Sequence, residues 1–124
     1  MQKLNIFIVD DASSIRRSLR GMLSKLNNIN IFGEADSVES AKNFLLKNKP
    51  DLTLLDLNLP DGSGYDVLSF IKNNEHNHIV IVLTNYSAEQ YKIKAVESGA
   101  DYFFDKSTEF EKIIDVINSL ITSY

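Results

Sequence analysis

The sequence predicts an α/β fold, in which one parallel sheet is covered by helices on both faces. Short apolar runs alternate with amphipathic stretches from one end of the chain to the other. The run 79–83 is apolar throughout and mostly β-branched, which is typical of a central strand buried on both faces. The length of 124 residues, with 44% hydrophobic and 24% charged residues, indicates an ordinary globular domain. We therefore expect residues 1–124 to form a single domain.

Five strands and five helices are expected in alternation. Apolar runs predict strands at 4–9, 29–33, 52–55, 79–83 and 102–104. Apolar residues at helical spacing predict helices over 15–26, 38–45, 65–71, 87–99 and 108–121. Three helix starts carry capping signals: Ser37 as an N-cap, and the pairs Ser87–Gln90 and Thr108–Glu111 as capping boxes. Gly99 is expected to end the fourth helix.

The order of the strands follows from general rules of connection. Crossovers between parallel strands are right-handed, which makes the fold an open three-layer sandwich. The common solution for five strands is the flavodoxin-like order 2-1-3-4-5. In such a sheet, binding sites lie at the carboxyl ends of the strands.

Composition excludes several classes of protein. The chain has no cysteine, so it has neither disulfides nor thiolate metal sites. Its net charge is −4, from 13 basic and 17 acidic residues, which argues against direct binding to nucleic acid. Asp10 and Asp11 interrupt the first apolar run, which is therefore neither a signal peptide nor a membrane span. We expect a cytoplasmic protein with no membrane partner.

Polar residues stand at the ends of four predicted strands. Asp10 and Asp11 end the first strand, Asp56 the third and Thr84 the fourth, and Lys106 follows the fifth. In the expected order these four strands are neighbours, so three carboxylates, a hydroxyl and an ammonium should share one crevice. Oxygen ligands without histidine or cysteine suit a hard cation, and Mg²⁺ is the natural choice. Phosphoryl transfer asks a protein mainly for such positioning and charge neutralisation.

The sequence resembles the receiver domains of two-component response regulators over essentially its whole length. The matching segments are 8–11 (IVDD), 54–64 (LLDLNLPDGSG), 82–84 (VLT) and 99–106 (GADYFFDK). Each motif alone is weak, but all four in order and at receiver spacing are highly specific.

The resemblance implies a role for each residue of the crevice. Asp56 is the implied phosphoacceptor, and it binds Mg²⁺ together with Asp11 and the backbone carbonyl of Asn58. Asp10 is implied to act mainly through metal-bound water. Thr84 and Lys106 are implied to hold the phosphoryl oxygens, and Thr84 with Phe103 to form the switch.

The resemblance also implies partners. The donor is a phosphohistidine on a sensor histidine kinase or a histidine phosphotransfer protein. The chain would catalyse only its own phosphorylation and dephosphorylation, so it is not expected to be an enzyme. We expect a stand-alone regulator that binds other proteins or relays its phosphoryl group. A downstream protein or a second copy would dock on the fourth helix, fifth strand and fifth helix.

Three positions depart from the commonest receiver pattern. Ser107 stands where a proline usually follows the lysine, and Asn85 where a very small residue usually follows the threonine. The switch aromatic is Phe103 rather than tyrosine. The catalytic groups themselves are all present.

Two rival functions are weighed against this one. A phosphatase of the haloacid-dehalogenase type also uses an aspartate nucleophile with Mg²⁺, but it needs a second aspartate where this chain has Asn58. The other rival is a receiver-like binding module that works without phosphorylation.

Among the remaining polar residues, His76 and His78 are expected at the surface. The arginines 16, 17 and 20 form either a solvated face or a docking site for a phosphodonor.

Overall fold

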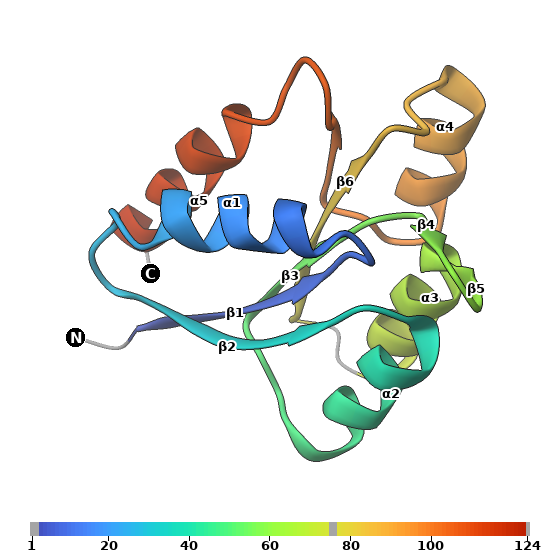
Figure 1. Cartoon of the computed structure of the whole chain (residues 1–124), viewed down its shortest axis with the longest axis horizontal. Helices are drawn as coiled ribbons and strands as arrows, with labels where there is room; N and C mark the ends of the chain where they lie inside the picture. Colours follow the sequence, from blue (N-terminus) through green and yellow to red (C-terminus); the bar gives the residue numbers. More distant parts are fainter. Residues whose placement is uncertain (1–2, 75–76, 124) are drawn as a thin grey trace.

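A sheet of five parallel strands forms the centre of the computed structural model, which describes residues 3–74 and 77–123 (Figure 1). Its order is β2-β1-β3-β6-β7. The strands are β1 (Leu4–Val9), β2 (Ile29–Ala35), β3 (Leu52–Leu55), β6 (Ile79–Thr84) and β7 (Tyr102–Asp105). Counted in chain order among the five predicted strands, this is the order 2-1-3-4-5, which confirms the flavodoxin-like α/β prediction.

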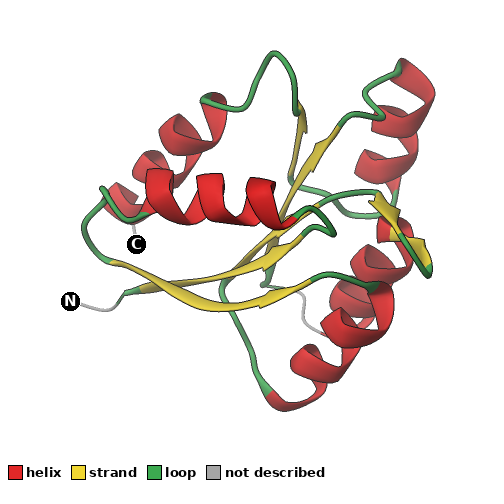
Figure 2. Cartoon of the chain, in the orientation of Figure 1, coloured by secondary structure: helices red, strands yellow, loops and turns green. Residues whose placement is uncertain are grey.

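Helices cover both faces of the sheet (Figure 2). They are α1 (Ser13–Leu23), α2 (Val38–Lys47), α3 (Gly64–Asn74), α4 (Glu89–Glu97) and α5 (Lys112–Ser123). Helices α1 and α5 pack on one face, whereas α2, α3 and α4 pack on the other, so the fold has the three predicted layers.

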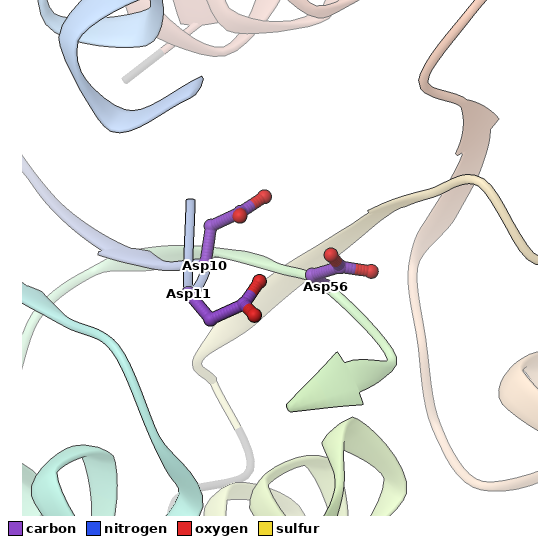
Figure 3. Close-up of side chains that lie close together, drawn as sticks. All are labelled: Asp10, Asp11 and Asp56. Atoms are coloured by element: carbon purple, nitrogen blue, oxygen red, sulfur yellow. The ribbon is translucent and has the colours of Figure 1, made fainter. Parts of the chain in front are cut away.

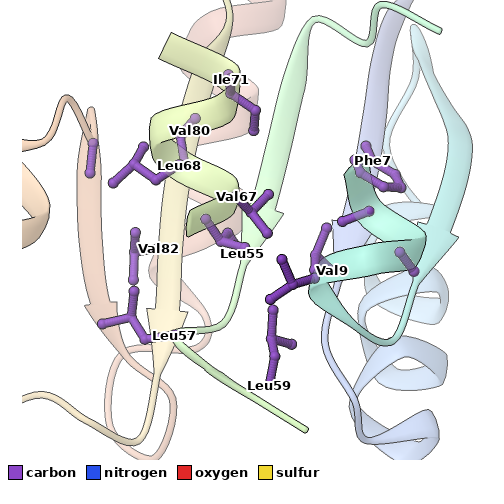
Figure 4. Packing of buried hydrophobic residues seen from close by; sticks show 14 of the residues in the cluster. Phe7, Val9, Leu55, Leu57, Leu59, Val67, Leu68, Ile71, Val80 and Val82 are labelled. Carbon is purple, nitrogen blue, oxygen red and sulfur yellow. The ribbon is translucent and has the colours of Figure 1, made fainter. Parts of the chain in front are cut away.

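The two faces have separate apolar cores, because successive residues of a strand point to opposite sides. In β1, Phe7 and Val9 belong to the core under α2, α3 and α4, and Ile6 and Ile8 belong to the core under α1 and α5. Figure 4 shows the first of these cores, in which side chains of α3 lie against those of the central strands. Burial on both faces explains why the central strands read as unbroken apolar runs.

The loop after β3 contains a feature that the sequence did not predict. The two-residue strands β4 (Asn58–Leu59) and β5 (Gly62–Ser63) pair in an antiparallel hairpin. Asp61, at the tip of the hairpin, accepts hydrogen bonds from the N–H groups of Val38 and Glu39, at 2.7 and 3.0 Å. The hairpin is thereby held against the N-terminus of α2.

The helix ends agree with the predictions in part. Ser37 caps α2, and Gly99 follows α4 with a φ of 108°. The two predicted capping boxes are wrong. Helix α4 has Ala88 as its N-cap with no side-chain bond, and α5 begins only at Lys112. The Asp105 carboxylate accepts hydrogen bonds from the Ser87 hydroxyl and from the Thr108 N–H.

The prediction that His78 lies at the surface is also wrong. The residue precedes the central strand β6 and is only 4% exposed. Its Nε2 lies 2.6 Å from Oγ1 of the buried Thr53, and this hydrogen bond makes its burial tolerable. His76 lies outside the described residues. Within the described part of the chain, no helix has the length and apolar content that crossing a membrane requires.

Candidate functional site

The predicted carboxylates meet at the carboxyl ends of two neighbouring strands, β1 and β3. Val9 and Leu55 are partners in the parallel register of β1 and β3, so Asp10 and Asp56, the next residues, leave the sheet side by side. Asp10, Asp11 and Asp56 each offer an oxygen within 4.8 Å of the others. Figure 3 shows the three side chains grouped beyond these strand ends. Asp10 and Asp56 are buried, whereas Asp11 is exposed.

Lys106 brings the one ammonium group that contacts this cluster in the described structure. Its Nζ lies 2.7 Å from Oδ2 of Asp10 and 2.8 Å from Oδ2 of Asp56. Its backbone N–H donates to the carbonyl of Thr84, at 2.9 Å. The lysine therefore joins the ends of β1, β3 and β6 from its position after β7.

The electrostatics of the cluster follow from burial and crowding. Burial raises the pKa of Asp10 above its ordinary value, against the lowering effect of the hydrogen bond from Lys106. Burial alone would lower the pKa of Lys106, but the hydrogen bonds to Asp10 and Asp56 outweigh it and hold this pKa above its usual range. The lysine therefore stays charged at neutral pH. With three carboxylates and one ammonium, the site still favours a further cation.

Local contacts orient Asp10. Its Oδ1 accepts the N–H of Ala12 at 2.9 Å, and its backbone carbonyl accepts a hydrogen bond from Nη1 of Arg16 at 2.7 Å. Arg16 and Arg20 both pair with Glu34 of β2. These two arginines are therefore not a free basic face, because they are engaged with Glu34 and the β1–α1 loop.

The other predicted residues surround Asp56. The Asn58 N–H donates to Oδ1 of Asp56 at 3.3 Å, which keeps Asn58 beside the carboxylate. Thr84 is fully buried, and its Oγ1 accepts the N–H of Tyr86 at 3.1 Å. Gly64 packs so tightly that an added Cβ would lie 2.2 Å from the Asp56 carbonyl oxygen. Only glycine fits there, which explains part of the glycine-rich loop that follows Asp56.

Comparison with known proteins agrees with this arrangement. The family model for the response regulator receiver domain matches residues 6–118. The chain belongs to the response regulator receiver domain family. The fold, a five-stranded parallel sheet with helices on both faces, is that of a receiver domain.

Known proteins similar to this receiver domain support the assignment. The sensory transduction protein LytT of Bacillus anthracis is 32% identical over 114 residues, which are 92% of this chain and 46% of that protein. The uncharacterized transcriptional regulatory protein YhcZ of Bacillus subtilis is also 32% identical, over 90% of this chain and 52% of that protein. This receiver domain thus spans about half the length of these relatives.

Solved structures show the same fold. The response regulator domain of Thermotoga maritima CheB superposes with a TM-score of 0.83 at 21% identity, over 98% of this chain and 96% of that one. The receiver domain of the Francisella response regulator 1452 gives a TM-score of 0.84 at 21% identity, over 98% of each chain.

Phe103 occupies the place expected of the switch aromatic. It is half-buried on β7, directly opposite Val82 of β6, and it packs against the core that includes Ala95 of α4.

Two residues with structural contacts were not predicted from the sequence. They are Asp105, whose carboxylate contacts three residues near the site, and Asp61, which anchors α2. The contact of Asp105 with Ser87 and that of Asp61 with Val38 span 18 and 23 residues, so no local pattern indicated them.

Proposed function

We propose that Asp56 accepts a phosphoryl group from a phosphohistidine donor in a Mg²⁺-dependent reaction. The observation that carries this proposal is the convergence of one ammonium, that of Lys106, and two further carboxylates, those of Asp10 and Asp11, on the Asp56 side chain. The product would signal through phosphorylation-dependent contacts with other proteins, or pass its phosphoryl group on.

Asp56 is a better nucleophile than Asp10. Both oxygens of Asp10 are engaged, Oδ1 by the Ala12 N–H and Oδ2 by Lys106. Within the described part of the chain, Oδ1 of Asp56 accepts one hydrogen bond, the long contact from the Asn58 N–H at 3.3 Å. An ionised carboxylate has no proton to lose, so it attacks phosphorus without a general base.

The residues present suit a hard divalent cation. Asp10, Asp11 and Asp56 offer only oxygen ligands, and the backbone carbonyl of Asn58 would add another. His78, the one described histidine, precedes β6 and so lies at the opposite edge of the sheet. Mg²⁺, when bound, would neutralise charge on the phosphoryl oxygens.

The remaining groups of the chain would stabilise the transfer. An oxygen of Asp56 attacks phosphorus, the P–N bond of the donor breaks, and the imidazole nitrogen leaves with the electron pair and takes up a proton. The Lys106 ammonium would bind one phosphoryl oxygen and the Thr84 hydroxyl another. Charge neutralisation and alignment are the main contributions a protein makes to this chemistry. Only this chain is modified, so we propose no separate substrate.

Labelling of the nucleophile tests the proposal. Acetyl phosphate with Mg²⁺ should give wild-type protein an acid-stable, hydroxylamine-sensitive phosphoryl group. Asp56→Ala and Asp56→Asn should both lose it, whereas Asp115→Asn, a change of an exposed carboxylate on α5, should keep it. Equal labelling of wild type and Asp56→Ala would exclude Asp56 as the acceptor.

Metal binding gives a second test. Mg²⁺ titration followed by NMR should show weak binding to the unphosphorylated protein. Asp11→Ala should weaken that binding most among the residues other than Asp56, because Asp11 has no ammonium partner to release among the residues that the structure describes. Unchanged affinity in Asp11→Ala would remove this residue from the ligand set.

The proposed partners are a sensor histidine kinase or a histidine phosphotransfer protein upstream, and another protein downstream. The downstream face would be α4, β7 and α5, where Ile93, Val96 and Tyr102 are exposed. A second copy of the chain is one candidate for this face. Action as a stand-alone regulator in the cytoplasm stays a prediction.

A further inference from the structure

Asp105, the residue before Lys106, connects the two loops that follow the neighbouring strands β6 and β7. Its Oδ2 accepts a hydrogen bond from the hydroxyl of Ser87, in the loop between β6 and α4. Its Oδ1 accepts the N–H groups of Ser107 and Thr108, at 2.7 and 3.1 Å, in the loop between β7 and α5. One carboxylate therefore closes a turn in its own loop and attaches that turn to the other loop.

A second contact joins the same loops. The hydroxyl of Ser107 lies 3.3 Å from Oδ1 of Asn85. Asn85 and Ser107 are two of the positions at which this chain departs from the commonest receiver pattern, and here they face each other. A proline at position 107 would have no N–H to donate to Asp105. Serine at this position therefore allows the hydrogen bond that closes the turn. The two departures are thus parts of one local arrangement.

These loops carry the two side chains that would hold the phosphoryl group. Thr84 is the last residue of β6, three residues before Ser87, and Lys106 begins the second loop, directly after Asp105. The Lys106 N–H also donates to the Thr84 carbonyl, which ties the loops together at the sheet. A shift of the Asp105 turn would therefore move Lys106 relative to Thr84.

The backbone of Asp105 is also restrained, by two hydrogen bonds with Glu109. The Asp105 N–H donates to Oε1 of Glu109 at 3.0 Å, and the Glu109 N–H donates to the Asp105 carbonyl at 2.8 Å. Hydrogen bonds, chiefly that from Ser87 and then that from the Ser107 N–H, hold the pKa of Asp105 below its ordinary value. The carboxylate therefore remains ionised, and an effective acceptor, throughout the neutral pH range.

We propose that Asp105 is a positioning residue for phosphoryl transfer, which acts through Ser87 to set Lys106 and Thr84 at the right separation. This inference rests on the proposed function, because it concerns the same reaction. Asp105 itself does not touch the carboxylate cluster in the described contacts. Its effect should fall on the phosphoryl-holding groups and not on the metal ligands, since Asp10, Asp11 and Asp56 belong to other loops.

Two pairs of variants test the inference. Ser87→Ala removes the bond between the loops, whereas Ser87→Thr retains a hydroxyl. Asp105→Ala removes all three acceptor contacts, whereas Asp105→Asn retains the size and one acceptor oxygen. Asp115→Asn changes an exposed carboxylate on α5 and is the control for loss of a carboxylate outside the two loops. Each protein is measured twice: for its phosphorylation rate with acetyl phosphate at saturating Mg²⁺, and for its Mg²⁺ affinity by NMR.

We expect Ser87→Ala to slow phosphorylation about threefold and Asp105→Ala about tenfold or more, as misplaced catalytic groups do. Mg²⁺ affinity should be unchanged in both, and Ser87→Thr and Asp115→Asn should match wild type. Wild-type rates in Ser87→Ala and Asp105→Ala would overturn the inference while leaving the proposed function intact. Parallel losses of rate and Mg²⁺ affinity would also overturn it, since they would show a merely structural role. Failure of wild-type protein to be labelled would instead reject the proposed function itself.

Discussion

The ammonium of Lys106 lies 2.7 Å from Oδ2 of Asp10, although the two residues are 96 positions apart in the chain. Both side chains are buried: the exposed fraction is 9% for the Lys106 side chain and 3% for that of Asp10. A third buried group, Asp56, shares the same ammonium at 2.8 Å. One positive charge thus lies between two buried negative charges.

Removal of the ammonium should destabilise the metal-free protein. Lys106→Met leaves two buried carboxylates without their partner, and we expect a loss of about 3 kcal/mol in the free energy of unfolding. Mg²⁺ should recover part of the loss, because it replaces the missing positive charge. Urea denaturation with and without Mg²⁺ measures both effects. Lys112→Met is the control: its ion pair with Glu109 is exposed, and its loss should cost at most about 1 kcal/mol. Equal stability of Lys106→Met and wild type would contradict the prediction.

Gly64 should tolerate no side chain. A Cβ there would lie 2.2 Å from the Asp56 carbonyl oxygen and 2.8 Å from Cα of Leu57, both of which are backbone atoms that cannot turn away. Gly64→Ala should therefore cost about 3 kcal/mol or more and slow the labelling of Asp56. The matched control is Gly21→Ala in α1, where nothing lies within 4 Å of the added Cβ. It should stabilise the protein by up to about 1 kcal/mol. Similar midpoints in thermal denaturation of the two variants would refute this account.

Asp61 should make stability depend on pH. The N–H groups of Glu39 and Val38 hold the pKa of Asp61 below its ordinary value. A carboxyl whose pKa is lowered by folding stabilises the protein above its unfolded pKa, about 3.9, and this contribution disappears as the pH falls through the folded value. Asp61→Asn should therefore lower the melting temperature at pH 7 but have little effect near pH 3. The melting temperatures of wild type and variant, measured across this range, give the difference directly. A difference that is independent of pH would show that the charge of Asp61 is not involved.

Phosphorylation should alter the surroundings of Phe103. The phosphoryl group adds about −1.5 to −2 charge, and a hydrogen bond from Thr84 would draw that side chain toward Asp56. Phe103 lies opposite Val82, two residues before Thr84, and packs toward α4, so its ring is placed to respond. Beryllofluoride, a phosphoryl mimic, should shift amide signals from Thr84 through Phe103 into α4. Shifts limited to the residues around Asp56 would reject this switch.

The sequence by itself determined the architecture of this receiver domain and the place of its site. The run 79–83 and its neighbours are apolar because strands covered on both faces have no solvent side, and that pattern needs no tertiary information. Parallel strands end at one edge of the sheet, so Asp10, Asp56 and Thr84 were predicted together from their positions alone. The same rule placed Lys106 beside them.

Only the tertiary structure decided how polar side chains are paired. Ser87 was predicted to cap α4, but Asp105, 18 residues away, takes its hydroxyl. His78 was predicted at the surface, but it is buried and forms a hydrogen bond with Thr53, which is 25 residues away in the sequence. A hydroxyl, imidazole or carboxylate gains similar energy from many partners, so local sequence cannot choose among them. Apolar periodicity is a local property of one element, whereas the partner of a polar group depends on which loops the whole fold brings within about 3 Å of it.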